Sequence, residues 1–155
     1  METNEKLNDV LNDLIRINHD REEGYEKAIK QLGLKEDGLK KMFRNYAKDS
    51  MQYADTLSAY VERNGGKPSN DATVSGKIYR AWMEVKTAMS SKESESVLDS
   101  CEYGEDAAQK AYQQALNADV NMGTEIRELV TRQKSLLKKA HDEVKRERDL
   151  HTTHH

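Results

Sequence analysis

The chain has 155 residues, of which 34% are charged and 35% hydrophobic, so it has the length of one ordinary domain and is too short for two separate cores. Its 25 Lys and Arg residues are interspersed with 28 Asp and Glu residues along the whole chain. A nucleic-acid-binding protein would need a concentrated basic face, so this pattern argues against one. No run of about 18 apolar residues is present, which excludes a transmembrane protein. We expect one domain over residues 1–150 and a polar, histidine-containing tail at 151–155, with neither nucleic acid nor membrane as a partner.

The cysteine count and the N-terminus bear on the compartment. Cys101 is the sole cysteine, so no intrachain disulfide can form and nothing indicates an oxidising environment. The first six residues are polar and of mixed charge, unlike the apolar segment of a secretory signal. We therefore expect a cytoplasmic protein.

Apolar residues recur at helical spacing in four long segments. The first predicted helix covers 7–32 and is followed by Gly33, and the second covers about 39–64, where Asn64, Gly65 and Gly66 end it. Further long helices are predicted from about 97 to 117 and from 124 to 150. A shorter amphipathic helix is predicted at 75–89, inside the long middle connection. No segment shows the alternating pattern of a strand, so the fold class is all-α.

The order of these segments predicts the topology. Tight connections make each pair of long helices antiparallel, and the long crossover lets the second pair lie beside the first. Residues Glu22–Ala28 and Glu105–Ala111 also form a faint repeat, with an acid, a lysine and an alanine in register. A duplicated helix pair joined by a crossover indicates a ferritin-like four-helix bundle, here with an extra short helix in the crossover.

Three blocks of sequence resemble a known family. The segments Asn18–Ala28, Val74–Met83 and Cys101–Ala108 resemble the PA-type family of bacterial four-helix-bundle proteins, a domain of unknown function placed in the ferritin-like superfamily. The similarity extends from about Leu7 to Leu150. The resemblance implies the fold and implies little about function, because that family is itself uncharacterised.

The di-iron centre of ferritin-like proteins can be tested on the sequence. That centre uses a Glu from each of two helices and a Glu-x-x-His pair from each of the other two, because residues i and i+3 share a helix face. The second predicted helix holds no histidine, and the residue three before His141 is Lys138. Both Glu-x-x-His motifs are therefore absent from the sequence.

Several polar residues nevertheless lie on the apolar stripes of the predicted helices. On a helical wheel Asn18, Arg21, Glu105 and Gln133 fall inside a stripe, whereas Glu22, Asp49 and His141 lie at its border. One interpretation is a packing network of Asn18, Arg21 and Gln133 with nearby acids, such as an Arg21–Glu105 or Arg21–Asp49 pair. The other is a degenerate metal site built from Glu22, Asp49, Glu105 and His141. An inward-pointing Arg21 would weaken the metal interpretation, because its fixed charge repels a cation.

These patterns predict a non-enzymatic structural or interaction protein, with a link to stress that rests only on analogy with ferritin-like proteins. The alternative function is a metal-binding or redox protein that holds iron, manganese or zinc at the atypical site. Its partner would be an unknown protein or a second copy of the chain. The tyrosines, including Tyr25 and Tyr112, are predicted to be core residues whose hydroxyls reach the rim, and Cys101 is predicted to be an inert core thiol.

Overall fold

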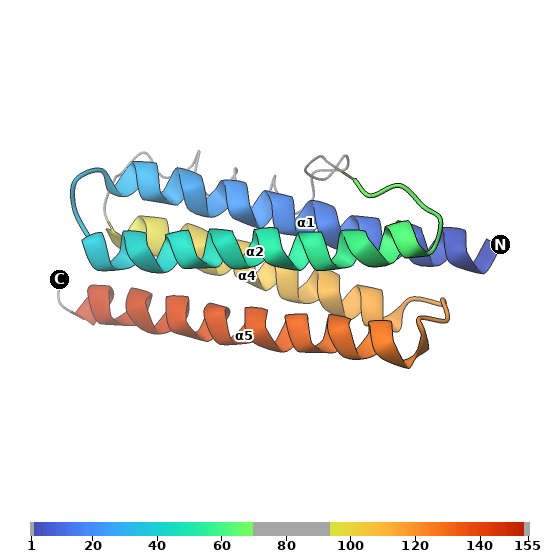
Figure 1. The fold of residues 1–155 in the computed structure, drawn as a ribbon. Helices are drawn as coiled ribbons and strands as arrows, with labels where there is room; N and C mark the ends of the chain where they lie inside the picture. Colours follow the sequence, from blue (N-terminus) through green and yellow to red (C-terminus); the bar gives the residue numbers. More distant parts are fainter. Residues whose placement is uncertain (1, 70–93, 154–155) are drawn as a thin grey trace.

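The structure is a computed structural model that describes residues 2–69 and 94–153. Most of these residues lie in four long helices (Figure 1). The helices are α1 (Glu2–Leu32), α2 (Asp37–Arg63), α4 (Ser94–Asn117) and α5 (Gly123–Thr153). Within the described ranges there is no strand, so the predicted all-α four-helix bundle is confirmed. The short crossover helix predicted at 75–89 lies outside the described residues.

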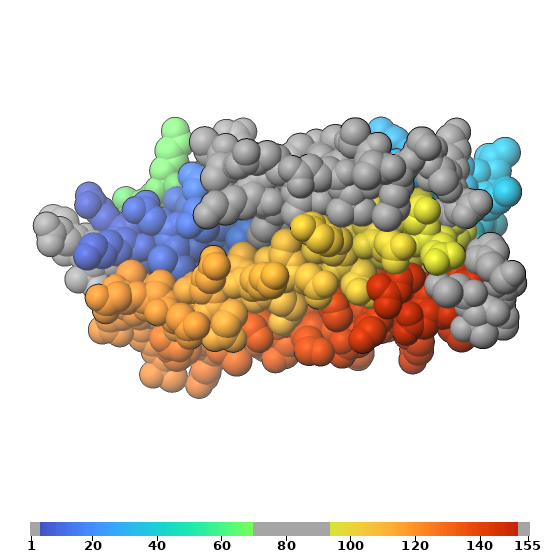
Figure 2. Space-filling view, turned by 180° about the vertical axis from the view of Figure 1, so that it is seen from behind, coloured from blue at the N-terminus to red at the C-terminus, as the bar shows by residue number. Residues whose placement is uncertain are grey.

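The four helices are arranged as two antiparallel pairs (Figure 1). Helix α1 packs along α2 and α4 packs along α5, while the two pairs meet mainly through α1 and α4. Seen from behind, α4 and α5 lie side by side along the bundle (Figure 2). None of the four described helices combines the length and apolarity needed to cross a membrane.

The helices extend further than the apolar stripes predicted. Helix α1 begins at Glu2 rather than Leu7, α4 begins at Ser94, and α5 continues to Thr153 instead of ending at Leu150. A contact outside the stripes accompanies the extended end of α5. The carboxylate of Glu36 accepts hydrogen bonds from the Ser94 hydroxyl and from Nε2 of His151, the latter at 2.9 Å. Residues 151–153 therefore belong to α5, and His151 contacts Glu36, although the sequence predicts a polar tail there.

The core is divided along the bundle axis into two apolar clusters. One cluster includes Leu11, Leu57 and Val130, and the other includes Phe43 and Leu98. Between the two clusters, at mid-helix, each helix places polar side chains in the interior. These are Asn18 and Arg21 of α1, Ser50 of α2, Glu105 of α4 and Gln133 of α5, all at most 5% exposed. We call these five residues the central polar layer.

Candidate functional site

The centre of the polar layer is an ion pair between α1 and α4. Arg21 and Glu105 are 1% and 0% exposed, and they meet through two parallel hydrogen bonds. Nε of Arg21 donates to Oε1 of Glu105 at 2.8 Å, and Nη2 donates to Oε2 at 2.7 Å. This fork geometry is the strongest form of a charge-assisted hydrogen bond. The pair thus joins the two helix hairpins at the middle of the bundle.

The remaining guanidinium donors of Arg21 reach α2. Nη1 donates to the backbone oxygen of Tyr46 at 3.0 Å and to Oγ of Ser50 at 2.6 Å. The guanidinium also lies against aromatic rings, 5.1 Å from the centroid of Tyr25 and 5.5 Å from that of Tyr46. Desolvation is the largest influence on the pKa of Arg21 and would lower it. The charge of Glu105, its hydrogen bond and the nearby tyrosines together outweigh desolvation and raise that pKa, so the guanidinium is permanently charged.

The carboxylate of Glu105 has a third donor in the Tyr25 hydroxyl, which donates to Oε2 at 2.5 Å. Burial, and then the neighbouring charge of Glu105, raise the pKa of Tyr25 well above its usual value. The phenol therefore stays protonated as the donor of this bond. Both carboxylate oxygens of Glu105 therefore accept hydrogen bonds from side chains of α1, and neither is free to bind a cation.

A second chain of hydrogen bonds links α1, α4 and α5 next to this pair. Nδ2 of Asn18 donates to the Tyr112 hydroxyl at 2.8 Å, and that hydroxyl donates to Oε1 of Gln133 at 2.7 Å. Nε2 of Gln133 in turn lies 3.4 Å from the backbone oxygen of Tyr53 on α2. The hydroxyls of Tyr25 and Tyr112 thus bond inside the bundle, although the sequence predicts them at the rim.

The residues predicted as metal ligands are divided between different places. Glu105 is held by Arg21, while Glu22 and Asp49 are only partly buried, a position that raises the pKa of each carboxyl. His141 lies at the α4–α5 surface, where its Nε2 is 2.7 Å from Oδ1 of Asp106. These side-chain positions do not bring the four together. The predicted packing residues Asn18, Arg21 and Gln133 all lie in the central polar layer.

The faint sequence repeat matches Glu22 with Glu105, but the two acids differ in burial. Glu105 is fully buried, whereas Glu22 lies at the border of the α1 stripe. It is Arg21, the residue before Glu22, that faces into the bundle and meets Glu105. A pair of acids related by symmetry is therefore replaced at the centre by an acid and a base.

Among the described residues, a single group of three potential ligands has its ligand atoms within 4.8 Å of one another: Glu102, Asp106 and His141. The sequence prediction includes His141 but misses both acids. The sequence shows their i, i+4 spacing on α4, but it does not show which part of α5 lies beside them.

Cys101 lies one turn before Glu105 and is buried, and this burial raises the pKa of its thiol.

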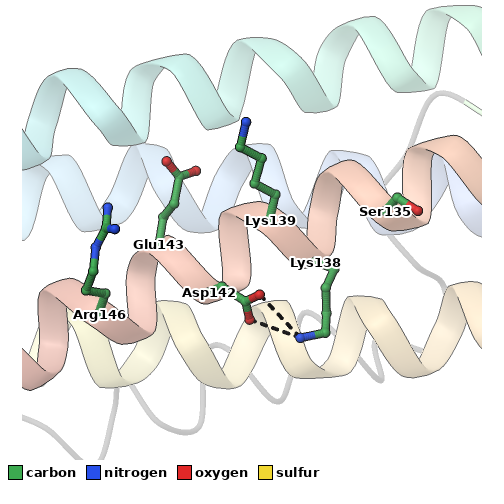
Figure 3. Close-up of a pocket in the computed structure, with 6 residues that line it drawn as sticks. All are labelled: Ser135, Lys138, Lys139, Asp142, Glu143 and Arg146. Carbon is green, nitrogen blue, oxygen red and sulfur yellow. Dashed lines mark hydrogen bonds and ion pairs between the residues drawn. The ribbon is translucent and has the colours of Figure 1, made fainter.

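A shallow hollow of about 570 Å³ lies on α5. Figure 3 shows Lys139 and Glu143 extending toward α2, and Lys138 bonded to Asp142 on another side of the helix. Glu143 accepts a hydrogen bond from the Tyr46 hydroxyl at 2.9 Å. Cations and acids alternate along this surface, so it presents no concentrated charge to a ligand.

Comparisons with known proteins agree with this architecture. The family described as "Domain of unknown function (DUF2383)" matches residues 6–118. The chain belongs to this family. Among solved structures, a mutant of Dps1 of Mycobacterium smegmatis is similar with a TM-score of 0.79 and 13% identity, covering 94% of this chain and 97% of that chain. This likeness confirms the predicted ferritin-like fold. No curated protein matches the sequence significantly.

Proposed function

We propose that this DUF2383 protein is a non-enzymatic structural or interaction protein. The observation that supports this proposal is the position of Arg21, whose guanidinium lies at the centre of the bundle and binds Glu105. A permanent positive charge in a low-dielectric interior repels a divalent cation. In this proposal the central polar layer fixes which helices face one another, and the function resides on the outer surface.

The alternative proposal is a metal-binding or redox protein that uses Glu22, Asp49, Glu105 and His141. It would require Glu105 to leave Arg21 and Tyr25, and His141 to leave Asp106. The partial burial of Glu22 and Asp49 raises the pKa of each carboxyl. This alternative predicts a metal that depends on Glu105.

The two proposals are separated by metal analysis of the purified protein after incubation with ferrous iron, manganese or zinc. Glu105→Gln keeps the shape of the side chain and removes its charge. We expect the metal content to be the same in this variant and the original protein, and we expect neither to accelerate the oxidation of ferrous iron in air. A metal content that falls in Glu105→Gln would support the alternative and contradict the structural role.

The interaction role is tested by light scattering during size-exclusion chromatography over a range of concentrations. A mass of twice 17.8 kDa would indicate that the partner is a second copy of the chain. A monomer at every concentration would direct the search to another protein. Leu34 is suited to a surface variant, because it is 99% exposed in the α1–α2 connection. Leu34→Ser should leave the fold unchanged and weaken any association through that end of the bundle.

A further inference from the structure

We propose that Glu102, Asp106 and His141 form a surface site for one divalent first-row transition-metal ion, with zinc as its representative. Glu102 and Asp106 are one helical turn apart on α4, so both face the same side. His141 approaches them from α5, and one ligand atom of each residue lies within 4.8 Å of the others. The site is separate from the central polar layer, and its existence does not depend on the function proposed above.

The imidazole of His141 is oriented as a metal ligand. Its Nδ1 lies 3.1 Å from Oδ1 of Asp142, while its Nε2 points to Oδ1 of Asp106 at 2.7 Å. Asp142 is itself fixed by Lys138, whose Nζ is 3.1 Å from the same oxygen. Histidines that bind metals donate their other ring N–H to a carboxylate in this manner, which directs the lone pair of the free nitrogen to the metal.

In the tautomer that carries its proton on Nδ1, His141 needs a cation between its Nε2 and Asp106. When Nδ1 donates its proton to Asp142, the lone pair of Nε2 and an oxygen lone pair of Asp106 face each other at 2.7 Å. Two lone pairs at this distance repel unless a proton or a metal ion lies between them. A bound metal ion satisfies both atoms and leaves the Asp142 hydrogen bond in place.

Glu102 supplies a second indication of a missing ligand. Its Oε1 accepts a hydrogen bond from Nη1 of Arg148 at 2.8 Å, but its Oε2 is buried and has no hydrogen-bond partner among the described residues. An unsatisfied buried oxygen is costly, and a metal ion would supply its partner. Arg148 thus orients the carboxylate through one oxygen and leaves the other for coordination.

Access and charge also suit a cation. The Asp106 side chain is 53% exposed, so an ion and its water ligands can enter from solvent. Among the charged side chains that pair with one another around the group, acids outnumber cations. The acids are Asp99, Glu102, Asp106, Asp142 and Asp149, and the cations that pair with them are Lys138 and Arg148.

The donor set indicates the class of metal. One imidazole and two carboxylates suit zinc and neighbouring divalent ions, whereas calcium and magnesium prefer oxygen ligands alone. Tetrahedral zinc bonds of about 2.0–2.2 Å place ligand atoms roughly 3.4 Å apart. The 2.7 Å between Nε2 of His141 and Oδ1 of Asp106 is shorter than that value, and all three ligand atoms lie within 4.8 Å of one another. Changes of side-chain rotamer would therefore close the site around an ion, and water would complete the coordination.

The test consists of two titrations of the full chain. Binding of cobalt(II) is monitored by its visible absorption, and binding of zinc is measured by calorimetry. His141→Gln and Asp106→Asn remove one ligand each, and the exposed Asp106 variant tests the site even where the histidine variant destabilises the fold. The matched control is His151→Gln, which breaks the pair of His151 with Glu36 and leaves the proposed ligands untouched. All proteins retain His154 and His155, so any weak binding by these residues is common to them.

We expect the original protein and His151→Gln to bind with the same affinity and to show the cobalt band of a low-symmetry site. We expect Asp106→Asn and His141→Gln to weaken binding about tenfold or more. Equal affinities in all four proteins would overturn the proposal, because the metal would then be bound elsewhere. Absence of binding in the original protein would also overturn it.

Discussion

Arg21 and Glu105 form a fully buried, two-pronged ion pair that connects α1 to α4 midway between the two apolar clusters of the core. Burial of two charges is costly, and their attraction compensates only when the geometry is good and the other donors are satisfied. The geometry is good here, and Ser50 and the backbone oxygen of Tyr46 accept the two bonds of Nη1 of Arg21. The pair therefore specifies the register of the helices.

Arg21→Lys should destabilise the protein by about 2 kcal/mol or more, as measured by urea unfolding, because a lysine cannot reproduce the fork and reach α2 as well. Arg63→Lys is the matched control. Its pair with Glu125 has the same 2.7 Å separation, but the two side chains are 63% and 64% exposed. The control should change the free energy of unfolding by less than about 1 kcal/mol. Similar losses in both variants would contradict a special role for Arg21.

Tyr112→Phe removes the hydroxyl that joins Asn18 to Gln133. Both amides would then lose a partner in the interior, so the variant should lose about 1–3 kcal/mol of stability. Tyr103→Phe, at a position that is 50% exposed, should change stability by less than about 0.5 kcal/mol. Thermal unfolding followed by circular dichroism compares the two, and an unchanged midpoint in Tyr112→Phe would show that water replaces the hydroxyl.

Gly33 and Gly38 flank the α1–α2 connection but adopt different backbone conformations. Gly33 has φ 64°, whereas Gly38 lies in α2, and a Cβ at either position would meet nothing within 4 Å. Gly33→Ala should therefore lose about 1 kcal/mol through backbone strain alone, and Gly38→Ala should gain up to about 1 kcal/mol. Urea unfolding of the two variants checks the opposite signs, and a loss in both would exclude this explanation.

The contact of His151 with Glu36 predicts a pH dependence. Burial alone would lower the pKa of His151, but hydrogen bonds to the backbone of Glu147 and to the Glu36 carboxylate raise it above 6.5. Because the folded pKa is raised, the stabilisation is complete below the unfolded pKa and is lost as pH rises through the folded value. Between about pH 6 and 8 the stability of the original protein should fall more steeply than that of His151→Gln. Parallel profiles would contradict a charged contact.

The sequence predicted the fold well because the apolar stripes are long and regular. It placed the end of α5 too early, where His151 makes a tertiary contact with Glu36. Such contacts join residues far apart in sequence and leave no trace in local periodicity.

For the site, the helical wheel placed Arg21 and Glu105 in the interior, because rotation about a helix axis follows from the sequence. The wheel does not give the level of one helix relative to another. It could therefore not choose between Glu105 and Asp49 as the partner of Arg21, nor bring His141 beside Glu102 and Asp106. Which side chains meet at the site depends on how far each helix is displaced along the bundle axis, and the packing of the helices determines that displacement.

The architectural role of the Arg21–Glu105 pair is measured by a double-mutant cycle with Arg21→Met and Glu105→Leu in urea unfolding. Each single variant leaves a buried charge without its partner and should lose about 3–5 kcal/mol. The double variant removes both charges, so it should lose no more than the worse single variant. If each single variant loses less than about 1 kcal/mol of unfolding free energy and the two losses simply add in the double variant, the pair has no such role.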